Sequence, residues 1–176
     1  MKNKTFDVVT IGNAIVDIIN PTGFNFLQKN SLVPGSMNLV SQSESKNLLS
    51  QCEPKEIISG GSAANTAVGI ASFGGKPVFI GKVKNDKYGN IFSKSLNNSG
   101  VMFKSIKSSE GPPTATSIIS VTPDGERTMC TCLGACLDLI ESDIDEKIIA
   151  NTNICYLEGY LWDPPEAKKA FKKAIS

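Results

Sequence analysis

A single run near the start of the chain limits the folds that this sequence can adopt. Residues Phe6 to Ile11, FDVVTI, are almost continuously apolar and rich in β-branched side chains, and the run ends at Gly12. Six residues is a usual strand length, and a strand without polar alternation is buried on both faces. Such strands occur in parallel sheets that helices cover on both sides. The run therefore predicts an α/β fold.

The rest of the chain alternates between strand-like and helical patterns. Ser41, with Glu44 three residues later, forms a capping box that predicts a helix to about Cys52. The prolines at 164 and 165 predict the start of another helix. The other expected helices cover residues 62–73, 86–99 and 142–150, and the other expected strands cover 15–19, 36–40, 77–83, 101–106 and 153–161, with a hairpin at 115–129. This order predicts a layered α/β sheet with a small antiparallel flap.

Composition excludes several classes of function. The 18 basic and 17 acidic residues leave a net charge of +1, so the chain has no global field for nucleic acid or an anionic membrane. There is no histidine, which excludes Ser-His-Asp hydrolysis, Cys-His proteolysis and a His-ligated zinc site within this chain. No stretch approaches the roughly 18 apolar residues of a membrane span, so no membrane partner is expected.

The five cysteines favour a reducing compartment. Their number is odd, their spacing is irregular, and no secretory signal precedes them, so we expect reduced thiols in a cytoplasmic protein. Cys130, Cys132 and Cys136 are close enough in sequence to raise the alternative of a metal cluster. Their spacing fits no common zinc pattern, and we expect ordinary buried thiols and no metal.

Polar residues at the ends of expected strands are candidates for a binding site, because ligands of open parallel sheets bind beyond the carboxyl ends of the strands. Asp17 interrupts the apolar segment AIVDII. A carboxylate there accepts two hydrogen bonds side by side, which suits two neighbouring hydroxyl groups. The alternative is an Asp on the exposed face of a half-buried strand.

The segment Gly60 to Asn65, GGSAAN, combines two features of a binding loop. Paired glycines permit close backbone approach and positive φ, and the helix start that follows offers free N–H donors. The amide of Asn65 donates and accepts at once, as sugar recognition requires. The alternative is a tight strand-to-helix turn capped by Ser62. Rossmann, P-loop and nucleophile-elbow motifs are absent from the sequence.

Four ordered motifs resemble the PfkB, or ribokinase-like, carbohydrate kinase family. They are TIGNAIVDI, GGSAANTAVGIASFGGKPVFIGKVKNDKYG, VTPDGERTM and YLEGYLWDPP. The resemblance extends from Phe6 to Ser176 and is nearest to the bacterial adenosine-kinase-like subgroup. It implies a ribokinase-like layered α/β/α sheet with a small antiparallel β lid. Residues 1–176 would be the amino-terminal portion of one kinase domain, with lid strands near 15–20, 36–40 and 115–130.

The resemblance also implies an activity and a set of binding residues. The activity is ATP-dependent phosphorylation of a sugar or nucleoside hydroxyl with Mg²⁺, adenosine or a related nucleoside being preferred, and some relatives pair through their lids as homodimers. The implied substrate-binding residues are Asn13, Asp17, Gly60, Gly61, Asn65, Glu158, Tyr160 and Trp162. The two aromatic side chains would stack on the base, and their alternative is core packing. Arg127 would reach the transferred phosphate, and its alternative is an exposed strand residue.

One family motif is missing from this sequence. Nothing after Gly61 resembles the Gly-Ala-Gly-Asp segment that supplies phosphate-binding amides and the general base. We therefore expect this chain to carry the substrate-binding half and lid, to lack phosphoryl transfer by itself, and to bind little of the ATP or Mg²⁺. Two alternatives stay open: a non-catalytic nucleoside- or sugar-binding module, and a half-protein that needs a carboxyl-terminal partner.

Overall fold

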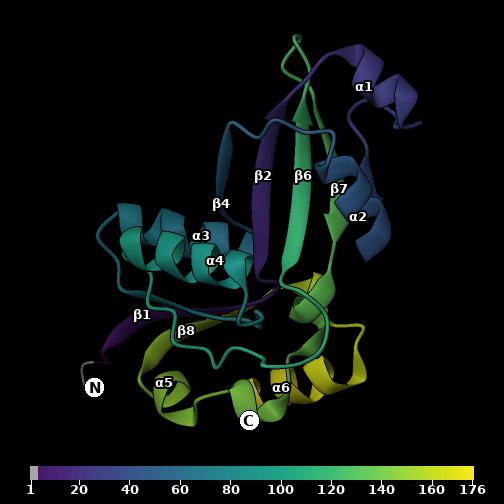
Figure 1. Ribbon diagram of the computed structural model, residues 1–176. Helices are drawn as coiled ribbons and strands as arrows, with labels where there is room; N and C mark the ends of the chain where they lie inside the picture. The colour runs from purple at the N-terminus through teal and green to yellow at the C-terminus, as the bar shows by residue number, and fades with distance from the viewer. Residues whose placement is uncertain (1–3) are drawn as a thin grey trace.

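The computed structural model describes residues 4–176 and contains two sheets that meet near the end of the first strand (Figure 1). The first is parallel, with the strand order β5-β1-β8. Its strands are β1 (Phe6–Ile11), β5 (Pro77–Ile80) and β8 (Thr152–Leu157). The last four residues of β1 are buried, as the continuous apolar run predicts for a central strand.

Helices lie on both sides of this sheet, which confirms the α/β prediction (Figure 1). Those on one side are α3 (Ser62–Ser72) and α4 (Lys87–Asn98), and those on the other are α5 (Glu146–Ala150) and α6 (Pro165–Ile175). Beneath β1, the apolar core gathers Val9, Ile11, Leu161 and Phe171. None of the helices in residues 4–176 combines the length and the apolar character that crossing a membrane requires.

The second sheet stands upright on the first and has the strand order β3-β7-β6-β2-β4 (Figure 1). Its strands are β2 (Ile15–Pro21), β3 (Met37–Leu39), β4 (Glu56–Gly60), β6 (Ala115–Val121) and β7 (Arg127–Cys132). The hairpin β6–β7 and the pair β2–β4 are antiparallel, whereas β2 pairs with β6 and β3 pairs with β7 in parallel. The sheet is therefore mixed, and not antiparallel throughout as expected.

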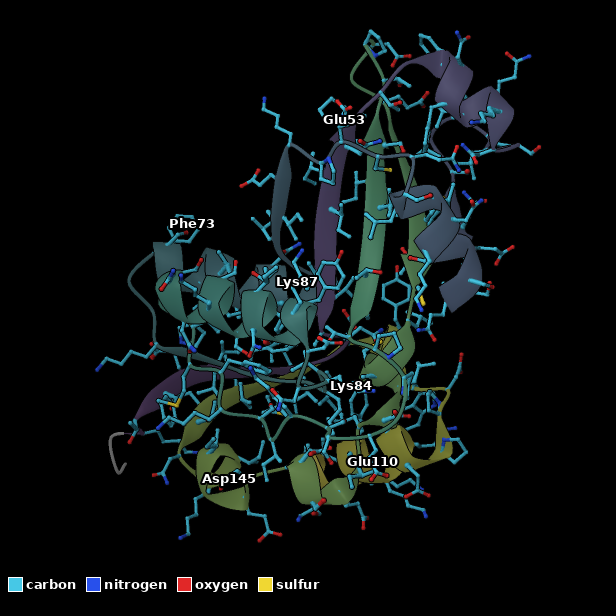
Figure 2. The ribbon with its side chains drawn as sticks, in the orientation of Figure 1. Glu53, Phe73, Lys84, Lys87, Glu110 and Asp145 are labelled. Atoms are coloured by element: carbon cyan, nitrogen blue, oxygen red, sulfur yellow. The ribbon has the colours of Figure 1, made fainter. Side chains whose placement is uncertain are left out.

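Helices cover one face of the second sheet and leave the other face open. In β2, Val16 and Ile18 are buried against Leu48 of α2 (Gln42–Leu49) and Phe92 of α4, whereas Asp17 points to the opposite, open face. The short helix α1 (Phe24–Lys29) follows β2 and has no signal in the sequence pattern. Figure 2 places Glu53 near the far end of this sheet and Asp145 at the other end of the molecule, beside α5.

Several expected elements are shorter in the structure, and each has a local reason. Residues 101–106 make only an isolated bridge, between Met102 and Val78, because Val101 and Phe103 turn into the helical layer. Strand β8 ends at Leu157, and a 3-10 turn (Gly159–Leu161) follows. The helix expected from residue 142 begins at 146, because Asp145 caps it by accepting from two backbone N–H groups.

The packing of the core around α4 predicts that replacing two different phenylalanines by alanine has very different effects on the free energy of unfolding. The rings of Phe79, Phe92 and Phe103 pack with centroids 5.3–5.8 Å apart, and Phe92 is fully buried. Phe92→Ala should lower the free energy of unfolding by about 3–5 kcal/mol in urea denaturation, because the cavity cannot be refilled. Phe73 is 94% exposed at the end of α3 (Figure 2), so Phe73→Ala is the matched control and should change little. Equal losses in both variants would contradict this packing.

Candidate functional site

The carboxyl end of β1 meets the start of α3 and the end of β8 at one buried carboxylate. Glu158 follows β8 and is 3% exposed. Its Oε2 accepts a hydrogen bond from the backbone N–H of Asn13, at 2.7 Å. Its Oε1 accepts from the Ser62 hydroxyl and from the backbone N–H of Ala63, the latter at 3.2 Å. Residues that lie 95 or more positions apart in the sequence are therefore joined at this point.

The glycine pair allows two of the predicted site residues to approach the backbone. A Cβ atom on Gly60 would overlap the carboxyl group of Asp17, so this carboxyl group occupies the space that a side chain would need. Gly61 has φ +92°, and a Cβ atom on it would lie 2.5 Å from the carbonyl oxygen of Asn13. Both positions therefore require glycine, the second also because positive φ is strained for other residues.

Asp17 has an unused carboxylate on the open face of the second sheet. Within residues 4–176 it has no hydrogen-bond or ion-pair partner, and it is aligned with Ile58 on one neighbouring strand and Ser117 on the other. Burial raises the pKa of Asp17 to about 6, although the positive charge of Arg127 opposes the rise. A partly desolvated carboxylate without a partner is a strong acceptor for ligand hydroxyls.

Asn13 has an unused side chain beside the same junction. It is 5% exposed, and its Oδ1 atom lacks any hydrogen-bond partner in the part of the chain that the structure describes. Leaving a buried amide oxygen unpaired costs about 1–3 kcal/mol, and most buried polar groups are therefore paired. A ligand hydroxyl at this place would satisfy it.

The remaining predicted site residues lie farther out. Asn65 is exposed in the first turns of α3, and Arg127 is exposed at the start of β7. Tyr160 is 80% exposed, and the ring of Trp162 packs 6.1 Å from that of Phe171 in α6. The junction thus brings together five predicted residues: Asn13, Asp17, Gly60, Gly61 and Glu158. It places Tyr160 on the surface and Trp162 against α6.

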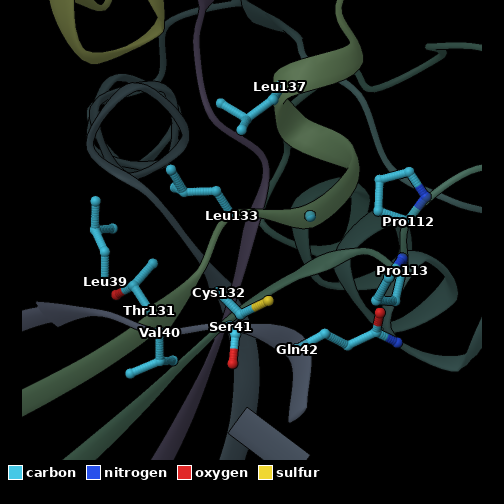
Figure 3. Close-up of a pocket in the computed structure, with 11 residues that line it drawn as sticks. Leu39, Val40, Ser41, Gln42, Pro112, Pro113, Thr131, Cys132, Leu133 and Leu137 are labelled. Carbon is cyan, nitrogen blue, oxygen red and sulfur yellow. The ribbon is translucent and has the colours of Figure 1, made fainter. Parts of the chain in front are cut away.

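A cavity of about 290 Å³ lies at the end of the second sheet, and the sequence reasoning missed its residues (Figure 3). Most of its lining side chains are apolar. They come from β3 and the start of α2, the loop before β6, and the end of β7 with the turn that follows: Leu39, Val40, Ser41, Gln42, Pro112, Pro113, Thr131, Cys132, Leu133, Gly134 and Leu137. The only feature of the sequence that pointed to this region is the alternating segment Met37–Leu39, which predicted a strand and not a cavity.

The strand register relates this cavity to Asp17. Thr131 of β7 and Asp17 of β2 are both aligned with Ser117 of β6, which lies between them. Directly aligned residues share a face, so Thr131 and Asp17 are two strand spacings apart on the open face, about 10 Å. One residue of the cavity lining therefore lies on the same sheet face as the unpaired carboxylate, two strands away.

The described residues offer no metal site built from protein ligands alone, and the cavity offers no positive charge for a triphosphate. Among residues 4–176, no group of three or more Cys, Asp or Glu side chains is placed to hold a metal ion. The cavity has no charged side chain in its lining, which does not suit a triphosphate. Cys130, Cys132 and Cys136 are free thiols that are buried in the structure.

Comparisons with known proteins agree on one family. Residues 28–176 match the family described as pfkB family carbohydrate kinase. The structure is similar to a probable sugar kinase protein from Rhizobium etli CFN 42, with 44% identity, a TM-score of 0.89, and coverage of 97% of this chain and 52% of that one. It is also similar to adenosine kinase from Sinorhizobium meliloti, with 47% identity, a TM-score of 0.87, and coverage of 96% and 52%.

A curated relative extends the comparison to the whole chain. A 5-dehydro-2-deoxygluconokinase from Clostridium botulinum (strain Alaska E43 / Type E3) is 30% identical over 178 residues, which cover 99% of this chain and 46% of the relative. This chain therefore spans about half the length of the relatives that it matches.

The contact between Gly61 and Asn13 predicts a position-specific loss of stability. Gly61→Ala should lower the free energy of unfolding by about 2 kcal/mol or more, because the new Cβ atom meets a backbone oxygen at a positive φ. Gly69, inside α3, has open space where a Cβ atom would stand, with nothing within 4 Å, so Gly69→Ala is the control and should gain up to about 1 kcal/mol. Urea denaturation of both variants measures the two changes in unfolding free energy. Equal changes would contradict the close approach of Gly61 to the Asn13 carbonyl oxygen.

The raised pKa of Asp17 predicts how stability depends on pH. The folded protein holds this proton up to about pH 6, whereas the unfolded chain releases it near 3.8, so ionisation of Asp17 lowers stability as the pH rises through that window. Asp17→Asn should therefore be more stable than the wild type at neutral pH, by on the order of 1–2 kcal/mol, and the difference should shrink as the pH falls toward about 4. Urea midpoints across this range test it, and an offset independent of pH would contradict the unpaired carboxylate.

Proposed function

This chain belongs to the pfkB family of carbohydrate kinases, and we propose its function on that basis. The match confirms the family that the four sequence motifs predict. From this premise we propose that these residues supply the substrate-binding part of an enzyme that phosphorylates a hydroxyl group of a nucleoside, with adenosine as the preferred substrate. The similarity to the adenosine kinase from Sinorhizobium meliloti, at 47% identity, supports a nucleoside as substrate.

The observation that carries the proposal is the unpaired Asp17 carboxylate, on the same sheet face as Thr131, which lies about 10 Å away and lines an apolar cavity. A vicinal diol is matched by a carboxylate, and a flat, weakly polar base is matched by an apolar cavity. A nucleoside carries these two groups side by side. A simple sugar would use Asp17 and leave the cavity empty.

Each neighbouring group has a role in this proposal. Asp17 accepts hydrogen bonds from the sugar hydroxyls, and the free Oδ1 atom of Asn13 accepts another. Gly60 and Gly61 let the Asp17 carboxylate and the Asn13 backbone lie close to the start of α3, near which Asn65 lies. Such contacts align the acceptor hydroxyl, and positioning is the larger part of phosphoryl-transfer catalysis.

The second sheet has a role as a whole. We propose that its strands near 15–20, 36–40 and 115–130, together with β4, act as a lid within one ribokinase-like domain that residues 1–176 contribute to. Closing the open face over the substrate would exclude water from the reacting hydroxyl. Arg127 is exposed on that face and is free to approach the phosphate. The exposed side chains of Met37 and Leu39 support a homodimer formed through this lid.

The family implies ATP and Mg²⁺, and we propose both for the complete reaction. The described residues contain no group of three or more Cys, Asp or Glu side chains placed to hold a metal ion, so no step of this proposal runs through Mg²⁺ or ATP. Because the sequence has no Gly-Ala-Gly-Asp-like segment, the 176-residue polypeptide is expected to bind adenosine without phosphorylating it. Its five free thiols suit a reducing compartment, which supports a cytoplasmic location.

A second candidate rests on a different observation. Strand β8 lies at the edge of the parallel sheet, and Ile154 on it is exposed, as is Tyr156. An apolar edge strand is a template for pairing with a further strand. This favours a half-protein in which binding requires a carboxyl-terminal partner that pairs with β8.

Calorimetric titration with adenosine and with ribose tests the proposal. The 176-residue polypeptide should bind adenosine more tightly than ribose. Asp17→Ala should weaken either ligand by about 1.5–3 kcal/mol, the scale of hydrogen bonds to a charged group. Leu39→Trp, at a lining position that is 64% exposed, should fill the cavity and weaken adenosine at least about tenfold while leaving ribose unchanged.

The outcomes separate the candidates. Equal binding of adenosine and ribose, insensitive to Leu39→Trp, would replace the nucleoside with a simple sugar. Binding that is unaffected by Asp17→Ala would remove Asp17 from the site. No binding of either ligand by a folded polypeptide would favour the half-protein that needs a partner.

A further inference from the structure

We propose that Glu158 is a positioning residue: it holds Asn13 and the first turn of α3 in the arrangement that binds substrate, and it does not touch substrate itself. The inference rests on the proposed function, and it differs from the sequence-based prediction that Glu158 contacts substrate directly. Its basis is the buried set of three hydrogen bonds at the junction of the two sheets.

The carboxylate of Glu158 has little capacity left for a ligand. An ionised carboxylate offers about four lone-pair sites, and three donors already occupy both oxygens. These bonds and the amino-terminal end of α3 compensate the buried charge, which would otherwise be strongly unfavourable. The three donors come from protein segments, so the charge is satisfied before any ligand arrives.

Packing closes the space around the same carboxylate. A Cβ atom on Gly12 would lie 2.8 Å from both Cβ and Cδ of Glu158 and 2.7 Å from Cβ of Ala63. The side chain of Glu158 is therefore pressed between the end of β1 and the start of α3. A substrate hydroxyl has no room to enter on this side.

The groups that Glu158 holds are the ones with unused binding capacity. Glu158 accepts a hydrogen bond from the backbone N–H of Asn13, and the side-chain oxygen of Asn13 is buried and unpaired. It also accepts hydrogen bonds from the Ser62 hydroxyl and the Ala63 backbone N–H at the start of α3. These residues directly follow the glycine pair, which Asp17 and Asn13 approach closely. One carboxylate thus fixes the two chain segments that carry the proposed ligand contacts.

The test compares Glu158→Gln with Ser62→Ala in the 176-residue polypeptide. Glu158→Gln keeps the shape but replaces one acceptor oxygen with an NH2 donor, so the amide that meets this donor, Asn13 or Ala63, should lose at least about tenfold of its protection from hydrogen exchange. Adenosine affinity should fall about 10- to 100-fold. Ser62→Ala removes only one donor and should leave the Asn13 amide protected and the affinity within about threefold of wild type.

A readout on the wild type separates positioning from contact and needs no variant to fold. With ¹³C-labelled carboxyl groups, saturating adenosine should shift the Asp17 resonance and leave that of Glu158 in place. A shift of Glu158 as large as that of Asp17 would overturn the inference, as would a loss of affinity in Glu158→Gln with unchanged exchange at both Asn13 and Ala63.

Failure of the proposed function gives a different pattern. If the wild type binds neither adenosine nor ribose, the function fails, and amide exchange still decides the positioning. Selective loss of protection at Asn13 or Ala63 in Glu158→Gln supports it, and unchanged exchange at both amides refutes it.

Discussion

The buried hydrogen bonds of Glu158 are the interaction on which the rest of the structure depends. The chain leaves the parallel sheet at Asn13 to enter the second sheet, and it returns at Gly61 to begin α3. The Glu158 carboxylate binds both crossings from the end of a third segment, β8. Because charge-assisted bonds are stronger than neutral ones, a single side chain holds both links in a low-dielectric environment.

A second carboxylate secures the other side of the junction. Asp86, the N-cap of α4, accepts from the backbone N–H and the hydroxyl of Thr114, at 2.9 and 2.8 Å, just before the chain enters β6. Burial opposes ionisation of Asp86, but these bonds, the backbone N–H of Gly89 and the charge of Lys84 together lower its pKa. The chain leaves β7 through Gly134, where a Cβ atom would overlap the carbonyl oxygen of Pro113. The second sheet is thus attached to the first by a narrow, tightly packed waist.

At this junction, the polar groups that are available to a ligand also lower the stability of the folded state. Most of its polar groups are paired, yet Asp17 lacks a partner in the described chain and Asn13 has an unpaired side-chain oxygen. Both are partly or fully removed from water, so both lower the stability of the folded state. The Asp17 carboxylate is held in a well-ordered junction, which reduces the entropy lost on binding, whereas the Asn13 oxygen has almost no exposed surface and has to be uncovered before a ligand can reach it. That balance is the physical reason to place the substrate here.

The sequence by itself determined the local elements and the family. The run FDVVTI predicted the buried parallel strand, and the capping box of Ser41 and Glu44 is formed as predicted, with the Ser41 N–H bonded to Glu44 at 2.7 Å. These follow from residues close in sequence, whose preferences act without the rest of the chain.

Only the tertiary structure decided the partner of Glu158, the pairing of β4, the mixed second sheet and the cavity beside Thr131. The hydrogen bond between Asn13 and Glu158 spans 145 residues, and such contacts form only once the whole chain has closed these loops. A strand such as β4, with one buried and one open face, takes its free energy from its neighbours and not from its own residues. For this reason the sequence predicted which residues are candidates for the site, and the fold decided which of them lie together.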